Sequence, residues 1–208
     1  LQIEHVPYNL ADLLREVARL YTPQVQAKNI TLHTKLDRAL PHELMGDPAR
    51  LRQILVNLLS NAVKFTPVGG QIDLSAQAAP HASPSAQALL IQVKDTGIGI
   101  TKERQAAIFD AFTQEDGSTA RHYGGSGLGL SICSRLVHLM SGTISVLSER
   151  GQGSTFSVQL PLKLQPKASD NARAASAPQP ADSTTDKRFT GLRVLVAEDH
   201  PVNELLMR

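Results

Sequence analysis

Apolar residues recur at spacings of three and four along three segments of the chain, which is typical of amphipathic helices. The predicted helices cover about 10–21, 48–65 and a segment that follows the glycines near position 129. Asn9 and Asp47 stand just before the first two helices and suit their N-caps, and a proline after Asp47 fits the first helical position. The third helix is expected to bury Ile132, Cys133, Leu136, Val137 and Met140 and to close at Gly142.

Other segments alternate between apolar and polar residues, which is typical of half-buried strands. These segments lie at 30–36, from 72 onward, at 89–94, at 144–147 and at 156–162. The order of helices and strands lacks the strict strand–helix–strand rhythm of a parallel sheet. We therefore predict an α/β (α+β) sandwich, in which one sheet carries helices on one face.

Composition divides the chain into three parts, with boundaries at 164 and 190. Residues 165–190 contain three prolines and a single large apolar residue, Phe189, so this segment cannot bury enough surface to fold and is predicted to be a linker. Residues 191–208 regain a strand-like pattern. With eight aromatic residues and no tryptophan, the predicted core is aliphatic.

Charge and cysteine content exclude several classes of protein. A net charge of +2 without a basic run argues against nucleic acid as the main partner. The single cysteine cannot form an internal disulfide, which fits a reducing, cytoplasmic location. Apolar runs of at most four residues predict no membrane contact by this stretch, and a chain that does not start with methionine is expected to be part of a longer protein.

The helix predicted over 48–65 carries a polar stripe at the edge of its apolar face. Asn57, Asn61 and Lys64 occupy positions i, i+4 and i+7 and therefore share one side of the helix. Amide oxygens are hard ligands that suit Mg²⁺, and an ammonium group attracts phosphate. A solvent-exposed helix face has the same composition, and the stripe alone favours that simpler interpretation.

A second candidate is the segment Asp95-Thr-Gly97-Ile-Gly99, which follows a predicted strand. A carboxylate at this point accepts a hydrogen bond from a ligand amine, while glycines allow the backbone to come close. Adenine has an exocyclic amino donor where guanine has an acceptor, so such a carboxylate favours adenine. An ordinary tight turn explains the segment equally well.

A third candidate is the glycine-rich segment 124–129, which opens the last predicted helix. Its backbone N–H groups suit an anion, yet Leu130 stands where a dinucleotide fingerprint needs glycine and a P-loop needs lysine. Before it, Phe109 and Phe112 precede a polar stretch from 115 to 123 that has the character of a lid. The alternatives are a flexible turn and a surface loop with two core aromatic residues.

The order of these segments closely resembles the catalytic ATP-binding domain of sensor histidine kinases, over residues 1–164. The matching motifs are Asn57-x3-Asn61-x2-Lys64-Phe65, Asp95-x-Gly97-x-Gly99, Phe109-x2-Phe112, Gly125-x-Gly127-x-Gly129 and Gly151-x-Gly153-Ser-Thr155-Phe156. The resemblance implies the fold shared with gyrase, mismatch-repair and chaperone ATPases, with a mixed sheet and a lid over ATP.

The resemblance also implies a role for each matching residue. Asn61 would ligate Mg²⁺, Asn57 would support metal and phosphates, and Lys64 would contact phosphate. Asp95 would bind the adenine amino group and Thr155 the base through water. The remaining nucleotide-binding positions would be Phe65, Gly97, Gly99, Phe109, Phe112, Arg121, Gly125, Gly127, Leu128 and Gly129.

Residues 192–203 resemble the start of a response-regulator receiver domain, in which an acidic pair matching Glu198 and Asp199 binds Mg²⁺. The parent would then be a hybrid histidine kinase in a two-component phosphorelay, with the rest of the receiver domain downstream. None of the seven histidines matches the family's phosphoacceptor motif, since His42 alone precedes a glutamate and lacks the later proline. The acceptor is therefore expected on a dimerisation hairpin outside this chain.

Two other functions compete with the kinase. Related ATP hydrolases place a glutamate general base where this chain has Asn57, and an amide is a poor proton acceptor. A nucleotide-sensing or partner-binding module without phosphotransfer would keep the same motifs, so only a measurement of phosphotransfer separates it from a kinase.

Overall fold

The computed structural model describes residues 2–80, 87–110 and 128–162. Its centre is a five-stranded sheet in the order β2-β4-β5-β7-β6. Strands β2 and β4 pair in parallel and the other pairs are antiparallel, so the sheet is mixed, as the resemblance implied. The strands are β2 Thr31–Leu36, β4 Gln71–Pro80, β5 Gln87–Asp95, β6 Thr143–Glu149 and β7 Gly153–Pro161.

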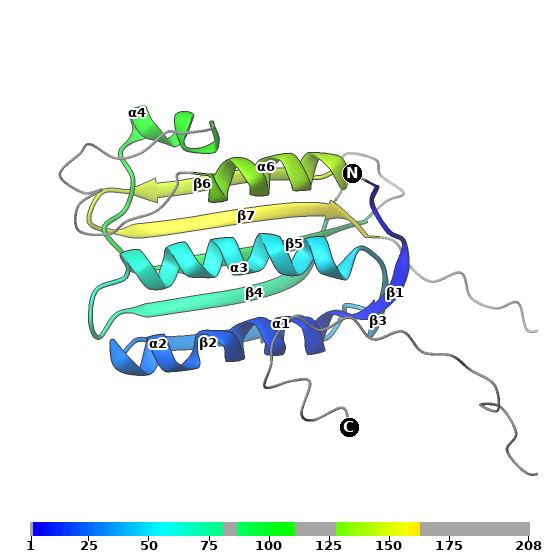
Figure 1. The fold of residues 1–208 in the computed structure, drawn as a ribbon, viewed down its shortest axis with the longest axis horizontal. Helices are drawn as coiled ribbons and strands as arrows, with labels where there is room; N and C mark the ends of the chain where they lie inside the picture. Colours follow the sequence, from blue (N-terminus) through cyan, green and yellow to red (C-terminus); the bar gives the residue numbers. More distant parts are fainter. Residues whose placement is uncertain (1, 81–86, 111–127, 163–208) are drawn as a thin grey trace, which may run out of the picture. The chain divides into compact units, whose positions relative to one another are not determined.

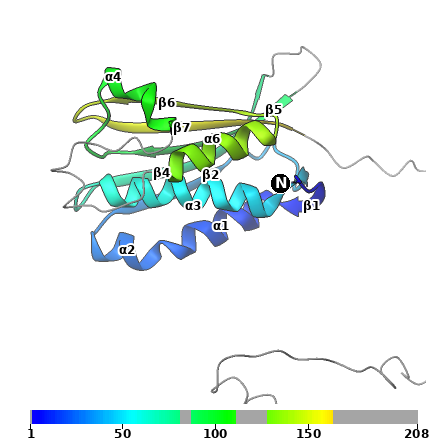
Figure 2. The same cartoon turned by 45° about the horizontal axis from the view of Figure 1, so that its top comes forward.

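Three helices, α1 (Leu10–Leu20), α3 (Pro48–Phe65) and α6 (Gly129–Leu139), cover one face of this sheet (Figures 1 and 2). The predicted two-layer sandwich is therefore confirmed. Buried aliphatic residues of the helices meet those of β4, β5 and β7 in one core. Phe156 is the one aromatic residue among the buried hydrophobic side chains of the described residues, which confirms the aliphatic core.

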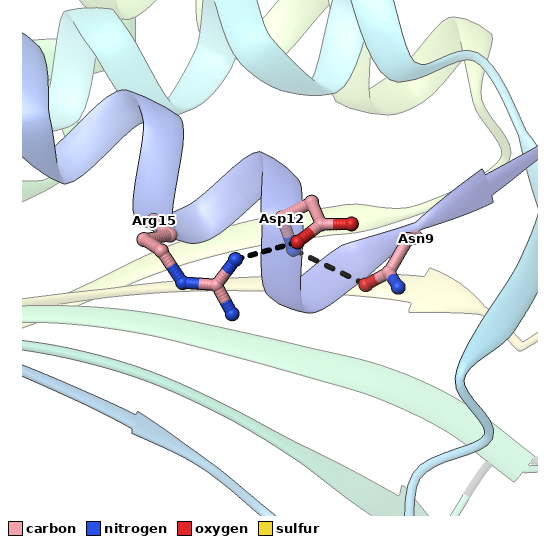
Figure 3. Close-up of polar contacts among 3 residues, drawn as sticks. All are labelled: Asn9, Asp12 and Arg15. Atoms are coloured by element: carbon pink, nitrogen blue, oxygen red, sulfur yellow. Dashed lines mark hydrogen bonds and ion pairs between the residues drawn. The ribbon is translucent and has the colours of Figure 1, made fainter.

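Both predicted N-caps form, because each uses only residues close in sequence. The Asn9 side-chain oxygen accepts from the Asp12 N–H at 3.1 Å, and Arg15 pairs with Asp12 at 2.5 Å (Figure 3). At the start of α3, one oxygen of Asp47 accepts from the Arg50 N–H at 2.9 Å. Each cap satisfies a backbone donor that the helix leaves without a partner.

The structure contains short elements that the periodicity did not predict. Strands β1 (Val6–Asn9) and β3 (Glu43–Gly46) pair in an antiparallel ribbon that is separate from the main sheet. The short helices α2 (Thr22–Ala27), α4 (Lys102–Gln105) and η1 (Ala107–Phe109) were also missed. These elements are three to six residues long, too short to display a helical or strand period.

The third helix differs from its prediction in two details. Ile132 is 38% exposed, so the buried face of α6 consists of Cys133, Leu136 and Val137. Ser141, with φ of 60°, takes the left-handed conformation after the helix. Gly142 closes the helix as predicted, since its N–H donates to the Val137 carbonyl at 2.9 Å, and a Cβ there would overlap the Gln159 carbonyl of β7.

Residues Leu1–Pro166 form one compact unit. The described residues end at 162, so the predicted linker 165–190 and the receiver-like tail 191–208 both lie outside them. Among the helices of the described part, none has both the length and the apolar character needed to span a membrane.

Candidate nucleotide site

The polar stripe of α3 lies where the helical periodicity placed it. Asn57, Asn61 and Lys64 are half-buried, while their neighbours Leu58 and Ala62 are fully buried. The Asn57 side chain donates a hydrogen bond to the Gly129 carbonyl at 3.4 Å. The stripe therefore faces the first turn of α6, so the polar stripe of α3 and the end of the glycine-rich segment lie side by side.

Cys133 joins the same contact and was not predicted to do more than pack. Its thiol donates to the Ile54 carbonyl of α3 at 3.7 Å. Burial raises the pKa of Cys133 to about 11, against the opposing effect of a hydrogen bond with Asn57. The thiol is therefore neutral and serves to hold α6 beside Asn57, one helical turn after Gly129.

Asp95 is the last residue of β5 and is only 5% exposed. The Gly97 N–H donates to its carboxylate at 2.8 Å. Burial raises the pKa of Asp95, while hydrogen bonds from the backbone of Gly97 and Ser154 act in the opposite direction. A carboxylate held by backbone donors at the end of a strand is a fixed acceptor for a ligand's N–H groups.

Gly97 brings the Asp95 turn into contact with the end of α3. A Cβ at Gly97 would lie 2.6 Å from the Asp95 carboxylate and 2.8 Å from the Phe65 carbonyl. Glycine is thus required by packing, and Asp95 and the stripe of α3 border one site. Gly99 has φ of 68°, and a Cβ there would overlap the Glu149 carbonyl.

The register of β5 and β7 decides which residue of β7 lies beside Asp95, and this residue is not the predicted Thr155. Ser154 pairs with Asp95 and is 7% exposed, whereas Thr155 pairs with Lys94. Because side chains alternate between the two faces of a sheet, Thr155 lies on the face away from the helices. The structure therefore brings Ser154, and not Thr155, to Asp95.

A serine pair links this site to α4, and no sequence pattern indicated it. The Ser148 hydroxyl accepts from the Ile100 N–H at 2.8 Å and donates to the Gly153 carbonyl at 2.8 Å. It also lies 3.0 Å from the Ser154 hydroxyl. Since Ser148 has one proton, Ser154 is the donor in this pair and keeps its lone pairs for other partners. Gln105 of α4 donates to the Ser148 carbonyl at 2.7 Å.

Aromatic and cationic groups complete the described part of the site. The Phe109 ring packs edge-on against Phe156, with centroids 6.5 Å apart, so it is anchored in the core as predicted. The Lys64 ammonium lies 4.7 Å from the centroid of the Phe65 ring. Leu128 is the N-cap residue of α6, and its carbonyl accepts from the Ser131 hydroxyl at 2.9 Å.

Several predicted residues lie outside the described ranges: Phe112, Arg121, Gly125, Gly127, Glu198 and Asp199, together with the lid-like stretch 115–123. Over the described ranges, no three His, Cys, Asp or Glu side chains gather into a metal site. The Asn61 amide oxygen fits Mg²⁺ as one hard ligand, and a metal there would need further oxygens from a bound polyphosphate.

Comparison with known proteins connects this geometry to a family. The sequence model of the histidine kinase-, DNA gyrase B- and HSP90-like ATPases matches residues 46–164. The sensor histidine kinase GacS of Pseudomonas protegens is 40% identical over 200 residues, 96% of this chain and 20% of its own length. The autoinducer 2 sensor kinase/phosphatase LuxQ of Vibrio parahaemolyticus is 36% identical over 208 residues, 99% of this chain and 23% of its own.

Solved structures agree with the fold. Full-length ShkA in complex with AMPPNP is 36% identical, with a TM-score of 0.69 over 79% of this chain and 32% of its own. The catalytic domain of the histidine kinase ThkA is 27% identical, with a TM-score of 0.62 over 76% of this chain and 95% of its own. The chain spans about a fifth of the length of the curated relatives it matches.

Proposed function

Because the chain belongs to the family of histidine kinase-, DNA gyrase B- and HSP90-like ATPases, we propose that it binds Mg-ATP and transfers the γ-phosphate to a histidine on another segment of its parent protein. Its relatives are sensor histidine kinases, and a related structure holds AMPPNP. The observation that carries the proposal is the contact between the buried Asp95 turn and the end of α3, which joins a base-binding acceptor to a phosphate-binding stripe.

Each described residue has a role in this proposal. Asp95 accepts a hydrogen bond from the adenine amino group, and Ser154 stands beside it as the partner of a bridging water. Asn61 supplies an amide oxygen to Mg²⁺, Asn57 orders metal and phosphates, and Lys64 neutralises phosphate charge. Thr155 has no role at the base in this proposal, because its side chain lies on the other face of the sheet.

The chemistry is a transfer in which positioning and charge neutralisation do most of the catalysis. An imidazole nitrogen forms a bond to the γ-phosphorus as the bond to the bridging oxygen breaks, and ADP leaves with that electron pair. Mg²⁺ supplies charge neutralisation when it is bound with ATP. Hydrolysis is disfavoured because Asn57, at the position where the hydrolases have a glutamate, cannot take a proton from water.

The partners follow from the residues that this chain lacks. None of its histidines has the family's phosphoacceptor pattern, so we propose a dimerisation hairpin of the same parent as the acceptor, in the cytoplasm where ATP is available. ThkA has been solved with its response regulator TrrA, at 26% identity and a TM-score of 0.60 over 76% of this chain. We propose a similar use of a receiver domain here, with Glu198 and Asp199 as its acidic pair.

The proposed division is a catalytic domain over 1–164, a linker over 165–190 and a receiver fragment over 191–208. The last eighteen residues are far below the roughly 40 residues that fold alone without extra support. Limited proteolysis should therefore cut between 165 and 190 and leave a fragment that still binds ATP. Loss of ATP binding on truncation at 165 would contradict this division.

The main test is titration of the chain with a fluorescent ATP analogue. Asp95→Asn should weaken binding about tenfold or more, because losing a charge-assisted hydrogen bond costs ~1.5–3 kcal/mol. Asp73→Asn is the matched control, since Asp73 pairs with Gln71 and Lys35 away from the site. Equal affinity of Asp95→Asn and the unchanged chain would remove Asp95 from the site.

Phosphotransfer separates a kinase from a nucleotide-sensing module. The isolated chain should bind ATP and gain no acid-labile phosphate from γ-labelled ATP, because no acceptor histidine is present. Adding the parent's hairpin as a separate polypeptide should produce weak labelling, which Asn61→Ala should abolish. Binding of ATP with no labelling of the hairpin would favour the sensing module.

A further inference from the structure

One lysine outside every predicted motif binds the end of the helix that carries the polar stripe. Lys28 follows α2, and its ammonium group donates to the carbonyls of Val63 at 2.8 Å, Lys64 at 3.0 Å and Thr66 at 3.2 Å. These three bonds use all three N–H donors of the ammonium group. Lys28 is half-buried, and the segments it joins are more than thirty residues apart in sequence.

The carbonyls that Lys28 binds are among those that a helix end leaves without partners. The last four carbonyls of an α-helix have no partner within the helix, and the helix dipole makes this end negative. The C-cap residue Thr66 supplies its own backbone N–H and its hydroxyl to the Ala62 carbonyl, the latter at 2.6 Å. Lys28 supplies the donors, and the positive charge, for the carbonyls of Val63, Lys64 and Thr66.

The turn after α3 is also tied to Lys28 through the backbone. The Lys28 carbonyl accepts from the Gly69 N–H at 3.0 Å, and the Thr31 N–H donates to the Gly70 carbonyl at 2.9 Å. The turn from Thr66 to Gly70 is therefore held from the side of β2 by both the side chain and the main chain of this segment.

On its other side, the same helix end touches the Asp95 turn. The Phe65 carbonyl lies so close to Gly97 that a Cβ there would be 2.8 Å away. Phe65 stands between residues whose carbonyls Lys28 binds, Lys64 and Thr66. A shift of the last turn of α3 away from Lys28 would move Lys64 and the wall of the Asp95 turn together.

We propose that Lys28 is a positioning residue of the nucleotide site, which fixes the last turn of α3 against the Asp95–Gly97 turn. The inference rests on the proposed function and adds a residue to it. Lysine suits the task because its ammonium is a compact charge with three rotatable donors, one for each of the three carbonyls around it. Lys28 itself does not touch the nucleotide.

The test compares two substitutions by their affinity for the fluorescent ATP analogue, at a temperature where each variant is folded. Lys28→Met keeps the length of the side chain and removes the donors, and it should weaken binding about tenfold. Lys35→Met is the control, since Lys35 lies on β2 with a side chain that is 70% exposed and pairs with Asp73 at 3.5 Å. It should leave the affinity unchanged.

A rescue separates positioning from a loss of stability. Lys28→Cys, alkylated with bromoethylamine, regains an ammonium group at nearly the original length, and the chain's own Cys133 is fully buried and unreactive. Alkylation should restore ATP affinity, and the backbone amide signals of Lys64 and Gly97 should return to their original NMR positions. Affinity that stays low after alkylation would count against the proposal.

The outcomes are distinct from those of the Asp95 test. If Asp95→Asn loses affinity while folded Lys28→Met binds ATP like the unchanged chain, the inference on Lys28 is wrong and the proposed function stands. If the unchanged chain does not bind ATP, both are wrong. Should Lys28→Met fail to fold, Lys28→Arg decides: its planar guanidinium spreads its donors over three nitrogens and cannot place three of them around the position of the Lys28 nitrogen, so unaltered affinity in that variant overturns the proposal.

Discussion

The two ends of α3 lie at opposite ends of the sheet and are built in different ways (Figure 1). At the first end, Asp47 caps the helix through the Arg50 N–H, and Pro48 occupies the first turn. At the second end, the partners come from far along the chain, with Lys28 on one side and Gly97 on the other. The first end is completed mainly by its own sequence, while the second is completed by the fold and borders the candidate site.

Two buried aspartates repeat this contrast. Asp47 is 2% exposed and Asp95 is 5% exposed. Asp47 uses both carboxylate oxygens inside the fold, one for Arg50 and the other for the Glu4 N–H at 3.1 Å. Asp95 faces a turn of glycines beside a helix end. Similar burial thus serves the helix cap in one case and, in the proposed function, ligand recognition in the other, and mutations should separate the two.

The largest effect is expected at Gly97. Gly97→Ala places a methyl group 2.6 Å from the Asp95 carboxylate, so either Asp95 or the last turn of α3 must move. We expect a loss of ~1–3 kcal/mol in the free energy of unfolding, by overpacking, and at least about tenfold in ATP affinity. Chemical denaturation and ATP titration measure both.

Gly129→Ala is the matched control for this prediction. A Cβ at Gly129 has room, since its nearest neighbour is the Asn57 side-chain oxygen at 3.7 Å. Because Gly129 lies in a helix, alanine should raise the free energy of unfolding by up to ~1 kcal/mol. A Gly97→Ala variant as stable as Gly129→Ala would mean that the Asp95 turn and α3 are not in contact.

The next effect concerns the serine pair. Ser148→Ala leaves the Ile100 N–H and the Gly153 carbonyl without the hydroxyl that serves both, which should cost ~1–3 kcal/mol in the free energy of unfolding. Ser145→Ala, on an exposed position of the same strand, should change it little. Equal stability of the two variants would show that water replaces the Ser148 hydroxyl.

A smaller effect is expected at the first end of α3. Asp47→Ala removes the N-cap and should cost ~1–2 kcal/mol in the free energy of unfolding, with no change in ATP affinity below the melting temperature. Thermal melts and titration of the same sample test this. A loss of affinity like that of Asp95→Asn would mean that the two ends of α3 are coupled.

The sequence predicted those features whose partners are neighbours in the chain. The caps at Asn9 and Asp47, the long helices and the paired strands all follow from local residues and periodicity. Lys28 and Ser148 were missed because their partners are brought together by folding, Lys28 with α3 and Ser148 with Ile100 and Ser154. Such contacts leave no mark on spacing.

Within the candidate site, the residue types were predicted better than their orientation. Asn57 and Asp95 lie where periodicity and strand ends placed them. Thr155 was predicted to contact the base, but the neighbouring Ser154 pairs with Asp95. A shift of one residue along a strand moves a side chain to the other face of the sheet. Ile132 was assigned to the core for a different reason: its position on α6 is at the edge of the buried face, where helical spacing alone does not separate buried from exposed residues.

The smallest expected effect is a pH dependence carried by Asp95. Burial raises the pKa of Asp95 above the ordinary value of 3.8, so the folded chain binds this proton more readily than the unfolded chain. The free energy of unfolding should therefore gain a contribution as the pH falls through the raised pKa, and this contribution is complete below 3.8. The sign is opposite to that of a carboxylate stabilised by an ion pair.

Asp95→Asn removes the titration and keeps the shape of the side chain. Near pH 7, Asp95→Asn should have a higher free energy of unfolding than the unchanged chain, and the difference should become smaller toward about pH 4. Denaturant titration without nucleotide measures both values. The same substitution should weaken ATP binding at pH 7. The Asp95 carboxylate would therefore lower the free energy of unfolding and raise the affinity for ATP. Asp47→Asn should leave ATP affinity unchanged, because the Asp47 carboxylate oxygens accept the backbone N–H groups of Arg50 and Glu4 inside the fold. Parallel pH profiles for the unchanged chain and Asp95→Asn would show that burial of the Asp95 carboxylate does not lower the free energy of unfolding.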